Sequence, residues 1–215
     1  MPLYSFEGPQ GTGKTMSAVA MAYEENKVHG RKVVSNNHLN FEYTHFDIAY
    51  FLDNVATHEL ENCVLLLDEA YQYIDARMSQ SKLNKLFTYF IVQTRKRDVD
   101  MYICTHHIDH LDKRLRRAID CRGIASYQEE KPCKKCKGSG TWGRNGSKPE
   151  KCPRCLGYGI YGASIMRFRW VRRRGRGRRF DVNIPGPYYW HLYSTKERMP
   201  IQSSAFEGID TLEIV

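Results

Sequence analysis

No run of about 18 consecutive apolar residues, the shortest length that crosses a bilayer as a helix, occurs in the 215-residue sequence. We therefore expect no membrane span. The first residues, Met1 to Glu7, also lack the basic and apolar stretches of a secretory signal, so we expect no signal peptide. Apolar residues make up 41% of the chain and aromatic residues 12%, which excludes wholesale disorder.

The number of cysteines is odd and no signal peptide is expected, which argues against a disulfide framework. Four of the seven cysteines form two C-x-x-C pairs, a spacing that favours metal binding in a reducing compartment. The length suits one domain with an insertion and allows a substantial buried core.

Acidic residues are nearly absent from two segments that hold the positive charge. The chain has 33 Lys and Arg against 24 Asp and Glu, a net charge of +9. Residues 131–159 carry eight basic residues and one acidic residue. Residues 166–179 carry no acidic residue and eight arginines: Arg167, Arg169, Arg172, Arg173, Arg174, Arg176, Arg178 and Arg179. Such a patch predicts contact with nucleic acid, and a solubilising surface is the alternative.

Strand and helix patterns alternate over the first 125 residues. Short apolar runs at 3–7, 32–35, 63–67 and 99–104 predict strands, and amphipathic spacing predicts helices after residue 15, at 46–54, around 83–91 and at 108–119. This order predicts an α/β fold with a mostly parallel central sheet. Residues 164–174 and 178–184 predict a basic β-hairpin, and residues 188–193 predict a last strand.

A glycine-rich segment between the first strand and the first helix matches G-x-x-x-x-G-K-[ST]. It comprises Gly8, Pro9, Gln10, Gly11, Thr12, Gly13, Lys14 and Thr15. Its backbone N–H groups are suited to bind phosphate oxygens. Lys14 can reach the β- and γ-phosphates, and the hydroxyl of Thr15 can bind a Mg²⁺ ion. The segment therefore predicts a site for ATP with Mg²⁺.

Two carboxylates follow the most apolar strand. Asp68 is expected to hold the Mg²⁺ together with Thr15, and Glu69 is expected to activate the attacking water. An ordinary strand end followed by a helix cap is the alternative. The second carboxylate favours hydrolysis over simple phosphoryl transfer.

Three further residues are candidates for contact with the γ-phosphate. His106 follows the strand at 99–104 and can sense the phosphate, although a plain loop histidine fits equally well. Arg95 and Arg97 precede that strand and can serve as an arginine finger across a subunit boundary, or as solvated cations at a helix end.

The motif C-x-x-C-x-G-x-G occurs twice, at 133–140 and 152–159. Cys133, Cys136, Cys152 and Cys155 therefore predict a closed, tetrahedral, structural Zn²⁺ site. The surrounding lysines suit either a phosphate backbone or a protein partner. The module resembles the cysteine-rich region of DnaJ co-chaperones with two of its four usual repeats, but no His-Pro-Asp of a J-domain is present.

The remaining motifs resemble those of a family of DNA motors. Residues 8–15, the segment Leu65 to Tyr71 and the run 94–97 before the strand at 100–105 are similar to the FtsK/HerA superfamily. More narrowly, they resemble viral genome-packaging ATPases and Zot-like phage morphogenesis proteins. The resemblance implies a ring homo-oligomer around double-stranded DNA, with Arg95 or Arg97 as the finger. His106 stands where that family usually has glutamine.

We thus expect four parts: a P-loop ATPase core at 1–130, a four-cysteine zinc module at 131–160, a basic β-hairpin with C-terminal strands completing the core at 161–200, and a tail at 201–215. The leading hypothesis is an ATP-driven translocase of double-stranded DNA that packages a viral genome. It would act in the cytoplasm of the infected cell or with the virion, and a capsid vertex or portal protein is a candidate partner. The alternatives are a Zot-like filamentous phage assembly ATPase and a zinc-dependent nucleic-acid adaptor switched by nucleotide.

Overall fold

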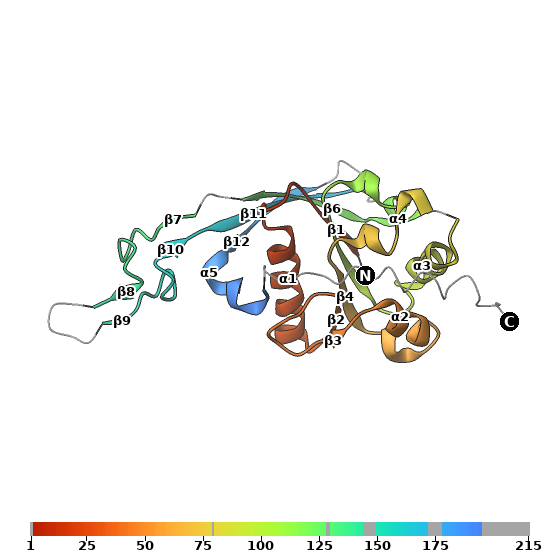
Figure 1. Ribbon diagram of the computed structural model, residues 1–215, viewed down its shortest axis with the longest axis horizontal. Helices are drawn as coiled ribbons and strands as arrows, with labels where there is room; N and C mark the ends of the chain where they lie inside the picture. Colours follow the sequence, from red (N-terminus) through yellow and green to blue (C-terminus); the bar gives the residue numbers. More distant parts are fainter. Residues whose placement is uncertain (1, 79, 128–129, 144–148, 172–177, 195–215) are drawn as a thin grey trace.

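A central sheet of eight strands organises the chain in the computed structural model (Figure 1). The structure describes residues 2–78, 80–127, 130–143, 149–171 and 178–194. The strand order is β12-β11-β6-β1-β5-β4-β2-β3. The strands from β6 to β3 run parallel, and β11 and β12 are added antiparallel at one edge. The predicted α/β fold with a mostly parallel sheet is confirmed.

The sheet strands are β1 (Leu3–Glu7), β2 (Lys32–Ser35), β3 (Thr44–His45), β4 (Cys63–Leu67), β5 (Asp100–Thr105), β6 (Cys121–Tyr127), β11 (Ala163–Trp170) and β12 (Arg179–Pro185). The α-helices are α1 (Lys14–His29), α2 (Ile48–Asn54), α3 (Lys82–Gln93), α4 (Lys113–Ala118) and α5 (Gly186–Tyr189). Short 3-10 helices are η1 (His58–Leu60), η2 (Ala70–Gln72), η3 (Ala76–Met78), η4 (Ile108–His110) and η5 (Trp190–Leu192).

Two hydrophobic cores cover the two faces of the sheet. Side chains alternate along a strand, so β4 sends Leu65 and Leu67 into one core and Val64 and Leu66 into the other. Helices α2, α3 and α4 lie on the first face and α1 and α5 on the second (Figure 1). All five residues of β4 are buried, as the continuous apolar run predicts.

Strand β11 supports the turn that leads into α1. Gly13 has φ of 86°, and a Cβ atom there would lie 2.6 Å from Oγ of Ser164 in β11. Ser164 also donates a hydrogen bond to the carbonyl oxygen of Thr12 at 3.1 Å. Glycine is therefore required at position 13 both for its backbone angle and for its lack of a side chain. The hairpin that follows the zinc module thus supports the glycine-rich loop through Ser164.

Two sequence predictions of secondary structure need correction. The strand predicted at 188–193 is wrong, because α5 and η5 occupy this segment. Pro187 explains the change, since proline in the first turn of a helix costs no hydrogen bond. The helix predicted at 108–119 is shorter and divided into η4 and α4.

The cysteine-rich segment projects from the sheet as a separate small unit (left side of Figure 1). Its strands are β7 (Lys131–Pro132), β8 (Thr141–Trp142), β9 (Glu150–Lys151) and β10 (Ile160–Tyr161). Strand β7 pairs with β10, and β8 pairs with β9. We call residues 131–161 the zinc module. Within the described ranges, we found no helix with the length and hydrophobicity needed to cross a bilayer.

Candidate nucleotide-binding and hydrolysis site

The glycine-rich loop joins β1 to α1 at the carboxyl edge of the parallel strands. Gly8, Gly11 and Gly13 have φ of 145°, 75° and 86°, a region that favours glycine. These angles let the loop turn tightly before Lys14, the first residue of α1. A phosphate group placed at this end of α1 would meet backbone N–H groups and the positive end of the helix dipole.

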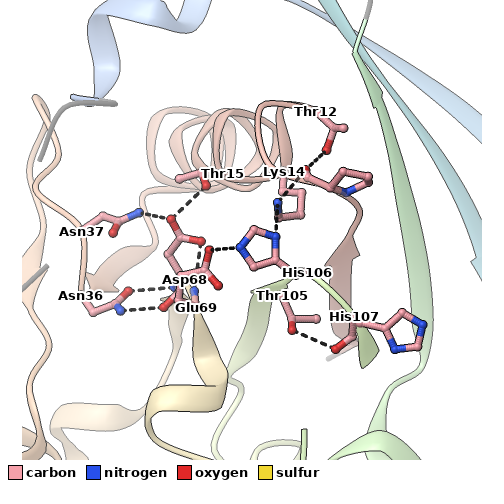
Figure 2. Close-up of polar contacts among 11 residues, drawn as sticks. Thr12, Lys14, Thr15, Asn36, Asn37, Asp68, Glu69, Thr105, His106 and His107 are labelled. Carbon is pink, nitrogen blue, oxygen red and sulfur yellow. Dashed lines mark hydrogen bonds and ion pairs between the residues drawn. The ribbon is translucent and has the colours of Figure 1, made fainter. Parts of the chain in front are cut away.

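Lys14 lies inside the loop and reaches the polar residues on the neighbouring strands. Its side chain is buried, and Nζ donates a hydrogen bond to the carbonyl oxygen of Pro9 at 3.0 Å. The same nitrogen lies 3.5 Å from Nδ1 of His106 (Figure 2). His106 follows β5 directly, as the sequence predicts, and the parallel pairing of β1 with β5 places it beside the loop.

Asp68 sits at the end of β4 in a network of polar neighbours (Figure 2). Its Oδ2 accepts hydrogen bonds from Oγ1 of Thr15 at 2.9 Å and from Nδ2 of Asn37 at 3.1 Å. Its backbone N–H donates to Oδ1 of Asn36 at 2.8 Å, and its carbonyl oxygen accepts from Nδ2 of the same residue. The paired hydroxyl and carboxylate oxygens of Thr15 and Asp68 are the hard ligands that Mg²⁺ prefers, so these residues fit the ion of a bound Mg-nucleotide.

Glu69 adopts a left-handed backbone conformation, with φ and ψ of 47°. This conformation is unusual outside glycine and turns the side chain toward His106. Oε1 lies 3.2 Å from Nε2 of His106, and Oε2 is buried without a hydrogen-bond partner among the described residues. Burial and the charge of Asp68 raise the pKa of the Glu69 carboxyl above its usual value. A half-buried carboxylate with a raised pKa suits proton abstraction from water.

Comparison with known families identifies this arrangement. Residues 4–125 match the ATPase family associated with various cellular activities (AAA). The chain belongs to the AAA family of ATPases. The matched segment runs from β1 into β6 and includes the glycine-rich loop, Asp68, Glu69 and His106. The P-loop ATPase predicted from the sequence is thereby confirmed.

Solved structures are similar to this chain at low sequence identity. The N-terminal domain of zonular occludens toxin from Neisseria meningitidis is 14% identical, with a TM-score of 0.57, and the match covers 90% of this ATPase and 98% of that domain. The DNA-packaging ATPase B204 from Sulfolobus turreted icosahedral virus is 14% identical, with a TM-score of 0.47, over 57% of this chain and 74% of that one. No curated protein matches the sequence.

The two candidate finger residues of this AAA ATPase lie far from its own glycine-rich loop. Arg95 and Arg97 precede β5, whereas the glycine-rich loop lies at the carboxyl edge of the sheet, where β5 ends. The six-residue strand β5 therefore separates the two arginines from the loop by roughly 17–20 Å. Arg97 donates hydrogen bonds to Oε1 of Gln93 and to the carbonyl oxygen of Thr57. Either arginine can therefore reach a nucleotide only if that nucleotide is bound to another subunit.

The zinc module brings its four cysteines together. The Sγ atoms of Cys133, Cys136, Cys152 and Cys155 all lie within 4.8 Å of one another, and all four residues are buried. The Sγ atoms of Cys133 and Cys152 are 3.9 Å apart, and those of Cys136 and Cys155 are 3.6 Å apart. Tetrahedral Zn–S bonds of about 2.3 Å require sulfur–sulfur distances of about 3.8 Å, so the cluster fits Zn²⁺.

The two cysteine motifs are bonded reciprocally, which explains the doubled glycines. The N–H of Cys133 donates to the carbonyl oxygen of Gly159 at 2.8 Å, and the N–H of Cys152 donates to that of Gly140 at 2.9 Å. Gly140 and Gly159 have φ of 75° and 74°, and a Cβ atom on either would collide with the backbone of the other motif. The last glycine of each motif therefore lets the two halves approach closely.

The basic hairpin is described only in part. Arg167, Arg169, Arg178 and Arg179 are exposed, whereas Arg172, Arg173, Arg174 and Arg176 lie outside the described residues. Arg169 in β11 pairs in register with Arg122 in β6 on one side and with Arg179 in β12 on the other. These three arginines form one row across the sheet, which we call the arginine row.

Sequence reasoning did not identify Asn36 and Asn37 as parts of the site. Both follow β2, which ends at Ser35, and β2 pairs in parallel with β4. Polar residues directly after a buried strand were the available signal, because parallel strands end at one edge. Trp190 and Tyr193 were also missed; they line the same cleft although they lie far along the chain.

Proposed function

We propose that the chain is an ATP-driven translocase of double-stranded DNA that works as a ring of identical subunits and packages a viral genome. The AAA ATPase core supplies hydrolysis, and the DNA-contacting surface is the arginine row with the neighbouring residues of β11 and β12. The arginine row carries the proposal, because two of its three charges form no salt bridge within the part of the chain that the structure describes.

The arginine row lies at the β6–β11–β12 edge of the sheet, on the face opposite α1. Residues 122, 124, 167 and 169 alternate with the buried residues of β6 and β11 and therefore share this face. Ile124 is 56% exposed there. Strands are about 4.8 Å apart, so the three arginines span about 10 Å. That width suits contact with several phosphates of one duplex.

Charge on this face is only partly balanced within the chain. Arg122 pairs with Glu7, its Nε lying 2.8 Å from Oε1, and Arg167 lies 3.4 Å from Asp181. Arg169 and Arg179 form no salt bridge with any residue in the described ranges. Like charges directly opposite across strands destabilise a sheet, so a bound polyanion would relieve repulsion within the row.

In this proposal Lys14 binds the terminal phosphates, Asp68 and Thr15 hold Mg²⁺, and Glu69 takes a proton from the attacking water. Mg²⁺ supplies charge neutralisation for the phosphates when it is bound. His106 contacts both Lys14 and Glu69, which places it to report the state of the γ-phosphate. Arg95 or Arg97 would act on the nucleotide of a neighbouring subunit in the ring.

The zinc module has a basic surface of its own. Lys134, Lys135, Lys137 and Arg154 are exposed, and Lys135 lies over the ring of Trp142 at 5.0 Å. Zn²⁺ would hold the module in one conformation through its four cysteines. The module would then extend the DNA-binding surface or dock on a capsid vertex or portal protein.

A filamentous phage assembly ATPase is the second candidate. The observation that favours it is the shared fold with the zonular occludens toxin domain over 90% of the chain. A nucleotide-switched, zinc-dependent adaptor is the third. Both differ from the first proposal in not requiring DNA to speed hydrolysis.

Removing Arg169 and Arg179 tests the DNA surface. We expect Arg169→Ala/Arg179→Ala to weaken binding to double-stranded DNA roughly tenfold at low salt, and to lower the slope of log affinity against log salt by about 2, because two phosphate contacts are lost. Fluorescence anisotropy over a salt series with two unrelated DNA sequences measures both quantities. The loss should be the same for both sequences.

The matched control is Lys27→Ala/Lys85→Ala, which removes the same charge from exposed positions on α1 and α3. This variant should bind DNA with nearly the affinity and salt slope of the unchanged protein. The lower net charge should cause only a small decrease. Equal losses in the two double variants would show that net charge alone accounts for binding and would contradict the proposed surface.

A further inference from the structure

The cleft above the glycine-rich loop continues beyond the space that phosphates need. It has a volume of about 840 Å³ and begins at Gly13, Lys14 and Thr15. Ile160 of the zinc module and Trp190 and Tyr193 of the C-terminal segment line the part of the cleft that we call the far end. A volume of this order holds a whole small-molecule ligand, so a nucleotide bound by its phosphates would also reach the far end.

Trp190 is held in a fixed position at that end. It begins η5, and its indole packs so closely on Gly186 that a Cβ atom there would overlap the ring. The rings of Tyr158 and Trp190 also pack at right angles, with centroids 5.2 Å apart. The indole remains half-buried and lines the cleft. A rigid aromatic surface beside a cleft loses little freedom when it contacts a flat ligand.

The segment behind Trp190 is attached to the loop that carries Asn37. The N–H of Asn40 donates to the carbonyl oxygen of Leu192 at 2.8 Å, and Nδ2 of Asn40 donates to that of His191 at 2.7 Å. Leu39 and Tyr193 form an isolated β-bridge. The aromatic end of the cleft is thus joined to the network around Asp68.

Ile160 approaches the cleft from the zinc module. It lies in β10, where it pairs with Pro132, the residue before Cys133. The far end of the cleft therefore has one wall from the ATPase core, Trp190, and another from the stem of the zinc module, Ile160. An aromatic ring and an aliphatic side chain are the surfaces that hold a nucleobase by stacking and apolar contact.

We propose that the base of the bound nucleotide lies against Trp190, with Ile160 of the zinc-module stem completing its subsite. A bound nucleotide then forms a bridge between the zinc module and the ATPase core, because its base contacts residues of both. The proposal rests on nucleotide binding by an AAA ATPase and not on DNA, so it stands or falls independently of the translocase proposal.

The test compares ATP with inorganic tripolyphosphate, which has the phosphates but no base. We expect Trp190→Ala to weaken binding of Mg-ATP roughly tenfold or more, the loss typical of removing one base–aromatic stack. Binding of Mg-tripolyphosphate should be unchanged. Trp190→Phe should retain most of the ATP affinity. Isothermal titration measures each constant.

Trp142→Ala is the matched control, because its indole lies in β8 and contacts Lys135 instead of the cleft. It should bind both ligands as the unchanged protein does. Equal losses of ATP and tripolyphosphate affinity in Trp190→Ala, or no loss of either, would overturn the proposal.

A second measurement does not depend on whether Trp190→Ala folds. In Trp142→Phe/Trp170→Phe, Trp190 is the remaining tryptophan of the three in the chain. ATP should change its fluorescence with saturation, and tripolyphosphate should not. Identical responses to the two ligands, or no response to ATP, would also overturn the proposal.

Discussion

Glu69→Gln is expected to lower the rate of ATP hydrolysis by a factor of about 10² to 10⁴, because the substitution removes the proposed general base. The half-buried carboxylate lies beside His106 at the carboxyl edge of the parallel strands, and burial and the charge of Asp68 raise its pKa. Glutamine keeps the size and hydrogen-bonding capacity of the side chain but cannot accept the proton. Phosphate release under saturating ATP measures the loss.

ATP binding should persist in Glu69→Gln, because Lys14, Thr15 and Asp68 are unchanged. Glu59→Gln is the matched control: this exposed carboxylate pairs with Lys32, and its substitution should leave turnover as it is. If Glu69→Gln hydrolysed ATP at the unaltered rate, another residue would have to be the base.

Removal of Zn²⁺ is expected to unfold the zinc module. Four thiolates in a structural site supply about 10–16 kcal/mol of apparent binding free energy, most of which is folding free energy in a unit this small. The module has no buried hydrophobic cluster besides the four cysteines in its described residues. A zinc-selective chelator, or Cys133→Ser/Cys152→Ser, should therefore make residues 131–161 sensitive to limited proteolysis.

Binding of tripolyphosphate should survive the loss of Zn²⁺, because the glycine-rich loop belongs to the sheet. Metal analysis should give one Zn²⁺ per chain before chelation. Cys63 lies in β4, outside the four-cysteine cluster, so Cys63→Ser is the control and should still bind one Zn²⁺ per chain. A module that resists protease equally with and without metal would contradict the structural role of Zn²⁺.

The parts of the site that local sequence determines were predictable. The glycine-rich loop needs specific residues at fixed spacing, and β4 is a continuous apolar run that ends in Asp68 and Glu69. The two cysteine turns are equally local, since each C-x-x-C pair forms its own turn. These features required only short-range patterns.

Two kinds of feature were not predictable: a helical turn whose residues favour a strand, and features that depend on distant contacts. The segment 186–192 contains aromatic residues with high strand propensity, but packing of Trp190 on Gly186 and the position of Pro187 favour helical turns. Asn36 joins the site only because β2 pairs with β4. The arginine row depends on the register of β6, β11 and β12, which the sequence pattern alone does not fix.

The rate of ATP hydrolysis with and without double-stranded DNA tests the translocase account most directly. We predict a several-fold rise in rate on adding DNA, and a rate near background in either condition for Glu69→Gln, which assigns the measured hydrolysis to this site. A rate that double-stranded DNA leaves unchanged would contradict the account.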